Sequence, residues 1–303
     1  PSRPFPNRSK RSTIMAKTTV WETVTIVGVG LLGGSIGLAL HSRKLAKQVI
    51  GVGRHQSSLK KALARHAIDV GTTNLEKGTR DADLIVVCTP IADVVETVKS
   101  AAKCCRPEAL ITDVGSTKAS IVAALDYHLH GRFPSCHGYF IGSHPIAGSE
   151  KSGPEHARDN LFEDRNVILT PTSRTREDHL ARLIAFWTSL GARTTQMTPA
   201  VHDETMACIS HLPHLVAAAL AGITAKKHLP LVGSGWRDTT RVASGDVELW
   251  AQIFADNRKW TSRGIDKMID QLRAFRRAME RDEPNALREL LQEGKAIRDA
   301  VGN

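Results

Sequence analysis

The stretch TVTIVGVGLLGGS, residues 23–35, decides the fold of this chain. A β-branched run is followed by three glycines in the spacing G-x-G-x-x-G, and helix-like apolar spacing begins directly after them. The first glycine permits a tight turn, the second lets the backbone approach a pyrophosphate, and the third lets the helix pack on the strand. We therefore predict a dinucleotide site in this turn, made by Gly28, Gly30, Leu31, Leu32 and Gly33.

Further strands are predicted at residues 48–53, 82–90, 109–116, 140–148 and 166–171, with helix-length segments between the earlier ones and a helix after the last. Strands that alternate with helices indicate an α/β fold with a Rossmann-type doubly wound parallel sheet. The segment 82–90 ends in Thr89 and Pro90, which we expect to lie beside the cofactor.

The pattern changes after Thr198, where β-branched alternation gives way to helical stretches at 203–227, 247–257, 259–281 and 285–300. We predict three parts on this basis. Residues 1–22 form a basic, flexible N-terminal extension, residues 23–198 form the Rossmann NAD(P)-binding domain, and residues 199–303 form an all-helical second domain.

The composition is that of a soluble protein of about two domains, with 41% hydrophobic residues in 303. Apolar runs such as 84–88 are far shorter than the roughly 20 residues of a membrane span. The net charge of +10 partly reflects a Pro/Ser-rich tail, and 5% aromatic residues without a basic and aromatic motif argue against nucleic acid. Five cysteines without a C-x-x-C pair favour a reducing cytoplasm.

The second strand ends in VIGVGRHQSS, residues 49–58, and lacks the acid that usually holds the ribose of NAD. No Asp or Glu occurs between Glu22 and Asp69, whereas Lys and Arg are frequent there. Arg54, together with the Ser57 and Ser58 hydroxyls, would favour a 2′-phosphate that an acid would repel. We predict NADP as the preferred cofactor, with NAD possible. The alternative, that these bases form a solvated helix face, stays open.

Five motifs occur in a fixed order: GVGLLGGS (28–35), DVGSTK (113–118), GSHPIAGSEKSG (142–153), SHLPH (210–214) and GWRDTTRVASGD (235–246). With them the chain resembles the prephenate/arogenate dehydrogenases of tyrosine biosynthesis, from about residue 23 to the C-terminal helices. The resemblance implies a helical domain that binds substrate and forms a homodimer. It also implies oxidative decarboxylation of prephenate to 4-hydroxyphenylpyruvate, with hydride transfer to NADP or NAD, or of arogenate to tyrosine.

His144 is predicted to be the catalytic base. It lies just past a strand, where open α/β sheets bind ligands, and the ordinary pKa of histidine near 6.5 suits proton abstraction at neutral pH. Its place in SHPIAG matches the catalytic motif of the family. Ser116 would, as in the family, orient that histidine and touch the nicotinamide, although a turn-capping serine explains it nearly as well. Asp113 is expected to be structural.

Arginine can grip a carboxylate in bidentate fashion, and the substrate carries two carboxylates. Arg241 corresponds to the substrate-carboxylate arginine of the family. Arg237 is the weaker candidate, because it can instead pair with Asp238 or Asp246.

His211 and His214 lie on one face of a helix, with Ser210 before them, and are predicted to hydrogen-bond the substrate. A kink at Pro213 with partly buried histidines is the alternative. Ser149 and Glu150 are placed on a loop at the cleft mouth, where Glu150 could contact substrate or gate entry. No metal site is predicted, because a third ligand is not evident beside the two histidines.

Other functions remain open from the sequence. One is a different NADP oxidoreductase of the β-hydroxyacid dehydrogenase or imine reductase type, which would use a lysine of the helical domain and lacks HPIAG and SHLPH. Outside the enzymes, the alternatives are a non-catalytic NADP sensor and a basic nucleic-acid binder. The choice between prephenate and arogenate, and feedback inhibition by tyrosine, are not decided by these residues.

Overall fold

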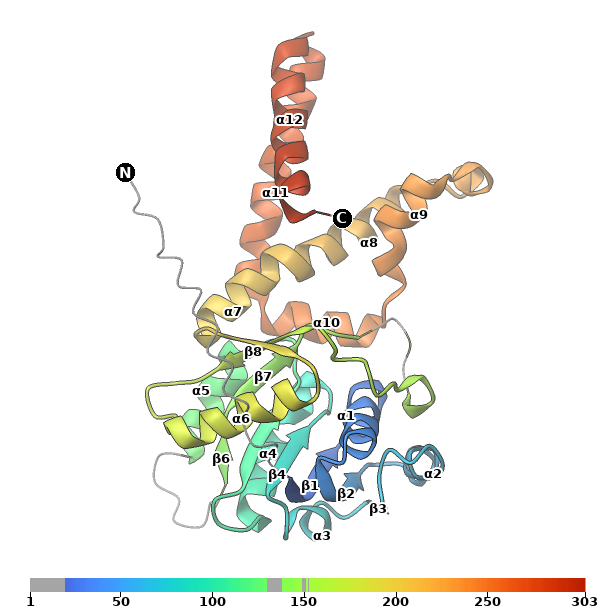
Figure 1. Ribbon diagram of the computed structural model, residues 1–303. Coiled ribbons are helices and arrows are strands. Elements are labelled where there is room, and N and C mark those ends of the chain that lie inside the picture. Colours follow the sequence, from blue (N-terminus) through green and yellow to red (C-terminus); the bar gives the residue numbers. More distant parts are fainter. Residues whose placement is uncertain (1–19, 130–137, 149–150, 152, 303) are drawn as a thin grey trace.

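The computed structural model describes residues 20–129, 138–148, 151 and 153–302. An α/β body carries a helical part above it, from which a long helical hairpin projects (Figure 1). Six parallel strands form the main sheet in the order β3-β2-β1-β4-β5-β6. The strands are β1 (Trp21–Val27), β2 (Ala46–Val52), β3 (Val70–Thr72), β4 (Leu84–Val87), β5 (Leu110–Asp113) and β6 (Tyr139–Phe140). This order confirms the predicted Rossmann-type sheet.

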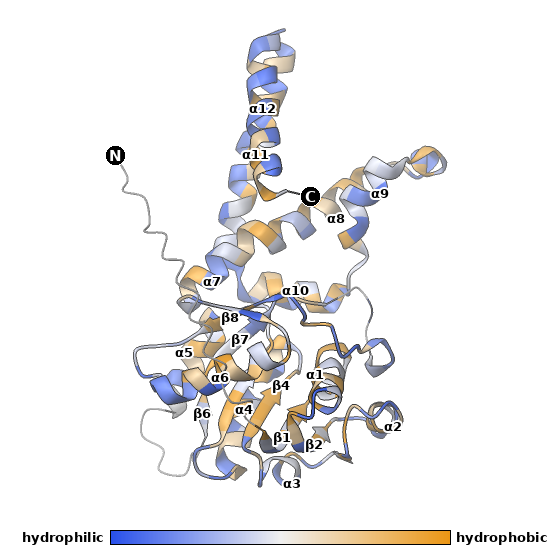
Figure 2. Cartoon of the chain, in the orientation of Figure 1, coloured by the Kyte–Doolittle hydropathy of each residue, from blue (hydrophilic) through white to orange (hydrophobic). Residues whose placement is uncertain are grey.

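The two faces of the main sheet bury separate apolar clusters. On β4, Leu84 and Val86 pack in the cluster of one face, whereas Ile85 and Val87 pack in the cluster of the other. Successive side chains of a strand point to opposite faces, so a strand covered on both sides reads as one apolar run. The strands are accordingly among the most apolar segments of the body (Figure 2). The covering helices include α1 (Leu31–Ser42), α2 (Gln56–Ala64), α3 (Leu75–Thr79), α4 (Ile91–Cys104) and α5 (Ala119–Leu129). A later helix, α6 (Glu177–Ser189), adds Leu183, Phe186 and Trp187 to the first cluster.

A second, three-stranded sheet leaves the main one. It contains β7 (Gly142–Pro145), β8 (Asn166–Thr170) and β9 (Arg193–Gln196), with β7 antiparallel to β8 and β8 parallel to β9. The expected strand at 140–148 is therefore two short strands in different sheets. Hydrogen bonds from β5 hold the break between them, because Thr112 Oγ1 donates to the Ile141 carbonyl. The helix α6 (Glu177–Ser189) connects β8 to β9.

The helical part begins at Pro199, where the Thr198 hydroxyl caps α7 by accepting from the Val201 amide. Its elements are α7 (Pro199–Met206), a five-residue π-turn (Ala207–His211), α8 (Leu212–Ile223), α9 (Ser234–Thr240), α10 (Val247–Asp256), α11 (Arg258–Glu280) and α12 (Pro284–Val301). The predicted stretch 203–227 is therefore interrupted by the π-turn and ends earlier, and α9 was not predicted. In Figure 1, α10 lies across the top of the body while α11 and α12 project away from it.

The continuous helical segment Pro199–Ile223 is long and apolar enough to cross a membrane by length and composition, with a mean hydropathy of 1.6. Only 28% of its most apolar window is buried within the chain. The apolar runs of the sequence do not reveal this segment, because polar residues such as His211 interrupt them. The segment also packs within the protein, because Asp203 accepts from the Lys118 amide before α5 and His214 stacks on Trp250 of α10.

Candidate active site

The glycine turn has the geometry that a dinucleotide requires. Gly28 has a φ of +99°, and a Cβ there would lie 2.5 Å from the Cys88 carbonyl oxygen. A Cβ on Gly33 would lie 2.1 Å from the Gly28 oxygen, whereas a Cβ on Gly30 would meet nothing within 4 Å. The protein itself thus requires Gly28 and Gly33, and Gly30 borders open space.

That open space lies at the N-terminus of α1. Gly30 is the N-cap residue, no side chain caps the helix, and no acidic residue occurs in its first turn, which begins with Leu31 and Leu32. Free amide groups and the positive end of the helix dipole attract phosphate. These residues therefore fit the pyrophosphate of NAD(P).

This division of roles predicts different outcomes for two matched substitutions. Gly30→Ala should leave the free energy of unfolding within about 0.5 kcal/mol of wild type, since nothing is displaced, but should weaken dinucleotide binding clearly. Gly33→Ala should destabilise the protein by about 1–3 kcal/mol through overpacking. Urea unfolding and fluorescence titration with NADPH measure the two effects. Equal loss of stability in both variants would contradict the assignment of Gly30.

Thr89 and Pro90 follow β4 and lie beside the glycine turn. The Thr89 amide nitrogen would be 3.2 Å from a Cβ on Gly28, and Pro90 is the N-cap residue of α4. The Thr89 hydroxyl is buried and has no hydrogen-bond partner among the described residues. A polar atom without a partner at this edge is available to a ligand.

Arg54 lies two residues after β2, with a side chain 76% exposed and 3.7 Å from Asp93 at the start of α4. An exposed pair of this length holds a side chain only weakly. Ser57 is exposed in the first turn of α2. Both residues are therefore free to meet a group bound at the carboxyl end of β2.

His144 is buried on β7 and hydrogen-bonds a second histidine. Its Nδ1 lies 2.9 Å from Nε2 of His202, and Nδ1 of His202 lies 2.7 Å from Oδ1 of Asp203. The same carboxylate accepts from the backbone amides of Lys118 at 2.8 Å and Ala119 at 2.9 Å. A chain of two imidazoles and one carboxylate thus links the second sheet, α7 and the start of α5.

The sequence analysis missed His202 and Asp203. The sequence shows only an adjacent His and Asp at the start of the helical part, and their burial on the inner face of α7 appears only in the structure. Neither residue belongs to the motifs that carry the resemblance.

Ser116 and Asp113 lie at the carboxyl end of β5. Asp113 is fully buried, pairs with the Lys118 ammonium group, and accepts from the amides of Gly115 and Ser143. These are the contacts of a structural residue. Ser116 is half-buried and makes no side-chain hydrogen bond among the described residues, so its hydroxyl is free to bind a ligand.

His211 and His214 lie against α10 and α11. His211 Nδ1 is 3.1 Å from the Asn257 amide nitrogen, which donates to it, and Asn257 also donates to the Asp203 carbonyl at 2.7 Å. His214 stacks on Trp250 with ring centroids 3.6 Å apart. The outer nitrogens, His211 Nε2 and His214 Nδ1, are buried without a partner among the described residues. Trp250 was not among the residues predicted from the sequence.

The π-turn sets the direction of these two rings. Each residue of an α-helix advances the side chain by about 100° around the axis, and a π-bulge adds one residue to the turn. In a regular α-helix of the same length, His211 and His214 would point about 100° away from their present direction relative to His202 on α7. Pro213, which cannot donate a helical hydrogen bond, stands directly after the turn.

Burial lowers the pKa of all four histidines. For His144 desolvation is the largest cause, followed by the nearby His202, Lys118 and His211, and its pKa falls well below the usual value. Burial likewise lowers the pKa of His202 and His214, and it lowers that of His211 to about 4. Burial opposes ionisation of Asp203, but hydrogen bonds from His202, Ala119 and Lys118 outweigh it and lower its pKa. The histidines are neutral at pH 7, and Asp203 is charged.

The structure does not join every predicted residue to this cluster. Arg241 begins a short 3₁₀ turn beside α8, and Arg237 lies on α9; both are exposed and neither makes an ion pair within the described residues. Ser210 is half-buried in the π-turn without a side-chain hydrogen bond there. Ser149 and Glu150 lie outside the described residues. Among those described, no three His, Cys, Asp or Glu residues are placed to hold a metal ion.

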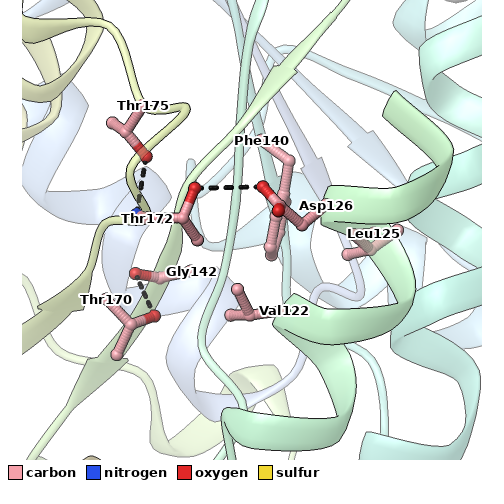
Figure 3. Close-up of a pocket in the computed structure, with 8 residues that line it drawn as sticks. All are labelled: Val122, Leu125, Asp126, Phe140, Gly142, Thr170, Thr172 and Thr175. Carbon is pink, nitrogen blue, oxygen red and sulfur yellow. Dashed lines mark hydrogen bonds between the residues drawn. The ribbon is translucent and has the colours of Figure 1, made fainter. Parts of the chain in front are cut away.

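A small enclosed cavity lies apart from this cluster, between α5 and the strands that follow it (Figure 3). Its free volume is about 10 Å³, which accommodates about one water molecule. The Thr172 hydroxyl donates to Asp126 across it at 3.0 Å. This cavity cannot hold a substrate.

Comparison with known proteins agrees with this geometry. Residues 36–196 match the family model "Prephenate dehydrogenase, nucleotide-binding domain", and residues 198–293 match "Prephenate dehydrogenase, dimerization domain". The chain belongs to the prephenate dehydrogenase family. It is accordingly a dehydrogenase with an NAD(P)-binding domain.

Three relatives illustrate the likeness. The prephenate dehydrogenase of Bacillus subtilis is 32% identical over 92% of this chain and 76% of its own length. The cyclohexadienyl dehydrogenase of Zymomonas mobilis is 29% identical over 93% of this chain and 97% of its own. The prephenate dehydrogenase of Aquifex aeolicus, solved with hydroxyphenyl propionate and NAD+, superposes with a TM-score of 0.85 at 32% identity, covering 94% of this chain and 100% of that one.

A 3-hydroxyisobutyrate dehydrogenase from Salmonella typhimurium shares only the fold, with a TM-score of 0.59 at 12% identity. The alternative of a β-hydroxyacid dehydrogenase therefore has support from the fold alone.

Proposed function

We propose that this chain is a prephenate dehydrogenase that acts in the cytoplasm and converts prephenate to 4-hydroxyphenylpyruvate in tyrosine biosynthesis. The observation that carries the proposal is His144: a buried imidazole whose pKa is lowered by burial, whose Nδ1 bonds His202 at 2.9 Å, and whose Nε2 makes no hydrogen bond within the described residues. It lies on β7, next to the carboxyl end of β5, as expected for a base at the ligand-binding edge of a Rossmann sheet.

The chemistry needs one base and firm positioning. The substrate hydroxyl gives its proton to His144 Nε2 as the C4 hydrogen leaves as hydride, and a C4 carbonyl forms. Loss of CO2 then sends the electron pair of the broken C–C bond into the ring, and His144 returns its proton to the phenolate oxygen. The nicotinamide, when bound, supplies the hydride acceptor. Aromatisation drives these reaction steps, so the main task of the protein is to orient the substrate against the nicotinamide.

The remaining predicted residues have roles in this proposal. Arg241 binds a substrate carboxylate, and His211, His214 and Ser210 hydrogen-bond the polar groups of the substrate. Ser116 orients His144 and touches the nicotinamide, and Ser149 and Glu150 are proposed as further substrate-binding residues. Support comes from His211 Nε2, His214 Nδ1 and the Ser116 hydroxyl, none of which has a hydrogen-bond partner in the part of the chain that the structure describes.

An initial-rate matrix of prephenate and arogenate against NADP and NAD tests the proposal. We expect the highest kcat/KM with prephenate. Arogenate dehydrogenation, giving tyrosine, is the second candidate, because an arogenate dehydrogenase from Synechocystis superposes with a TM-score of 0.77 at 32% identity over 92% of this chain and 99% of that one. Turnover of neither substrate would overturn both.

We further propose that NADP is preferred and that Arg54 binds its 2′-phosphate. A charge-assisted hydrogen bond contributes roughly 1.5–3 kcal/mol, so Arg54→Ala should raise the Kd of NADP about tenfold or more and leave that of NAD unchanged. Arg80→Ala, which removes another exposed arginine, the C-cap residue of α3, is the matched control and should change neither. An unchanged NADP preference in Arg54→Ala would contradict the proposal.

We also propose a homodimer formed by the helical part. Its apolar residues lack cover within one chain: Ile223 is 82% exposed and Leu231 is 84% exposed. Apolar patches of this kind mark association surfaces, and the matching family model describes a dimerization domain. Light scattering should give the mass of two chains. Ile223→Asp combined with Leu231→Asp should weaken the dimer, whereas the control Leu63→Asp on α2 should not. A monomeric wild type would refute the proposed dimer.

A further inference from the structure

We propose that His202 and Asp203 are positioning residues that hold His144 in the tautomer with its proton on Nδ1 and its lone pair on Nε2. This deepens the proposed function, because only that tautomer presents a base to the substrate hydroxyl. The proposal rests on the distances of the buried chain His144, His202 and Asp203 and on the donors and acceptors each can offer.

The direction of the hydrogen bonds follows from Asp203. Both its oxygens accept backbone amides at the start of α5, as a carboxylate does and a protonated acid would not. The 2.7 Å contact therefore requires His202 Nδ1 to donate to Asp203. A neutral His202 then has an unprotonated Nε2, which can only accept. The proton in the 2.9 Å contact must belong to Nδ1 of His144.

Among the described residues, the other charged and titratable groups around the pair do not offer His144 an alternative partner. Lys118 is buried nearby, but its ammonium group is paired with Asp113. His211 faces Asn257, which donates to its Nδ1, and the same amide holds the Asp203 carbonyl. The hydrogen bonds of α5, α7 and α11 thus fix Asp203, and through it both rings.

The arrangement also serves the moment when His144 carries the proton. The imidazolium then donates through Nδ1 to His202, whose own Nδ1 donates to the ionised Asp203. Positive charge on His144 is in this way spread toward a fixed carboxylate, without any change in geometry. His202 and Asp203 touch neither substrate nor cofactor in this scheme.

Nitrogen-15 NMR of histidine tests the proposal without turnover. Wild-type His144, assigned by its loss in His144→Gln, should show the Nδ1–H tautomer. His202→Asn keeps a polar group near Asp203 but removes the acceptor at the Nε2 position, so the His144 signal should become a mixture of tautomers. His202→Gln can place an acceptor oxygen near that position and should restore the Nδ1–H form in part.

Kinetics gives the second readout. In His202→Asn, kcat should fall about 10- to 100-fold with KM for prephenate unchanged, and His202→Gln should recover part of it, in line with the 10²–10⁴-fold span of acid–base catalysis. His41→Asn is the control, since His41 also bonds an aspartate, Asp69, at 3.2 Å but outside the site. It should change neither readout.

An Nε2–H tautomer of His144 in the wild type would overturn the proposal even if the variants do not fold. So would a His202→Asn variant with wild-type kcat and tautomer. If wild type turns over neither prephenate nor arogenate, the proposed function fails while the NMR result still decides the tautomer.

Discussion

Replacing His144 with asparagine is expected to lower kcat by about 10²–10⁴-fold while leaving KM for prephenate nearly unchanged. Asparagine can keep a hydrogen bond near the Nδ1 position of the ring, but it has no basic nitrogen where Nε2 stands. The transition state therefore loses its proton acceptor, whereas the substrate keeps its binding contacts. Stopped-flow and steady-state absorbance of NADPH measure the change. Wild-type turnover in this variant would remove His144 from the chemistry.

The pH profile gives an independent check. The base acts only when unprotonated, so kcat/KM rises with pH through the pKa of His144. Because burial and the neighbouring His202, Lys118 and His211 lower that pKa, the acid limb should lie below pH 6.5. Its disappearance in His144→Asn would assign the limb to this residue. An acid limb above pH 7 would contradict the assignment.

Arg241→Ala provides the opposite pattern. If Arg241 binds a carboxylate equally in ground and transition states, its loss should mainly raise KM and leave kcat near wild type. Equal damage to kcat and KM in both the His144 and Arg241 variants would undo the division of roles.

The second large effect is expected for Lys118→Met, which should destabilise the protein by about 3–5 kcal/mol. Lys118 and Asp113 are both 0% exposed and form an ion pair. Removing the cation leaves a buried carboxylate without its counter-charge, and burial of an isolated charge is very costly. Urea denaturation followed by circular dichroism measures the loss.

Lys47→Met is the matched control for that variant. Lys47 pairs with Glu22, but both side chains are more than 60% exposed. Exposed pairs contribute about 0–1 kcal/mol, so the control should remain close to wild type. Equal losses of unfolding free energy in the two variants would show that the buried pair stabilises the protein no more than the exposed one.

The sequence predicted the part of the fold that local patterns encode. A parallel sheet covered on both faces is indicated by two local patterns: the turn that requires glycine at Gly28 and Gly33, and the apolar run of β4. It did not predict β3, which has three residues, or the departure of β7 from the main sheet. That departure depends on the hydrogen bond that the Thr112 hydroxyl donates to the Ile141 carbonyl and on the one that the Ser143 hydroxyl donates to the Asp113 carbonyl. Each joins residues about 30 positions apart, which periodicity does not report.

The candidate site divides in the same way. His144 could be predicted because it lies in a recognisable motif at the end of a strand. His202 and Trp250 could not, since their significance arises only when α7 and α10 fold against the α/β body and its histidine neighbours. The environment of Arg241 also depends on how a short turn packs on α8, which no local pattern fixes.

The π-turn between α7 and α8 makes the length of this helix as important as its composition. A regular α-helix of unchanged length between His202 and His211 would keep every side chain discussed above but would turn His211 and His214 by about 100° relative to His202. Deleting one residue of the turn, such as Ala207, would let the backbone run as an uninterrupted α-helix and leave the directions of these rings nearly unchanged. The extra residue and the π-turn therefore compensate for each other, and the histidines converge only when both are present or both are absent. In this segment, a one-residue gap in a relative would be compatible with an intact site.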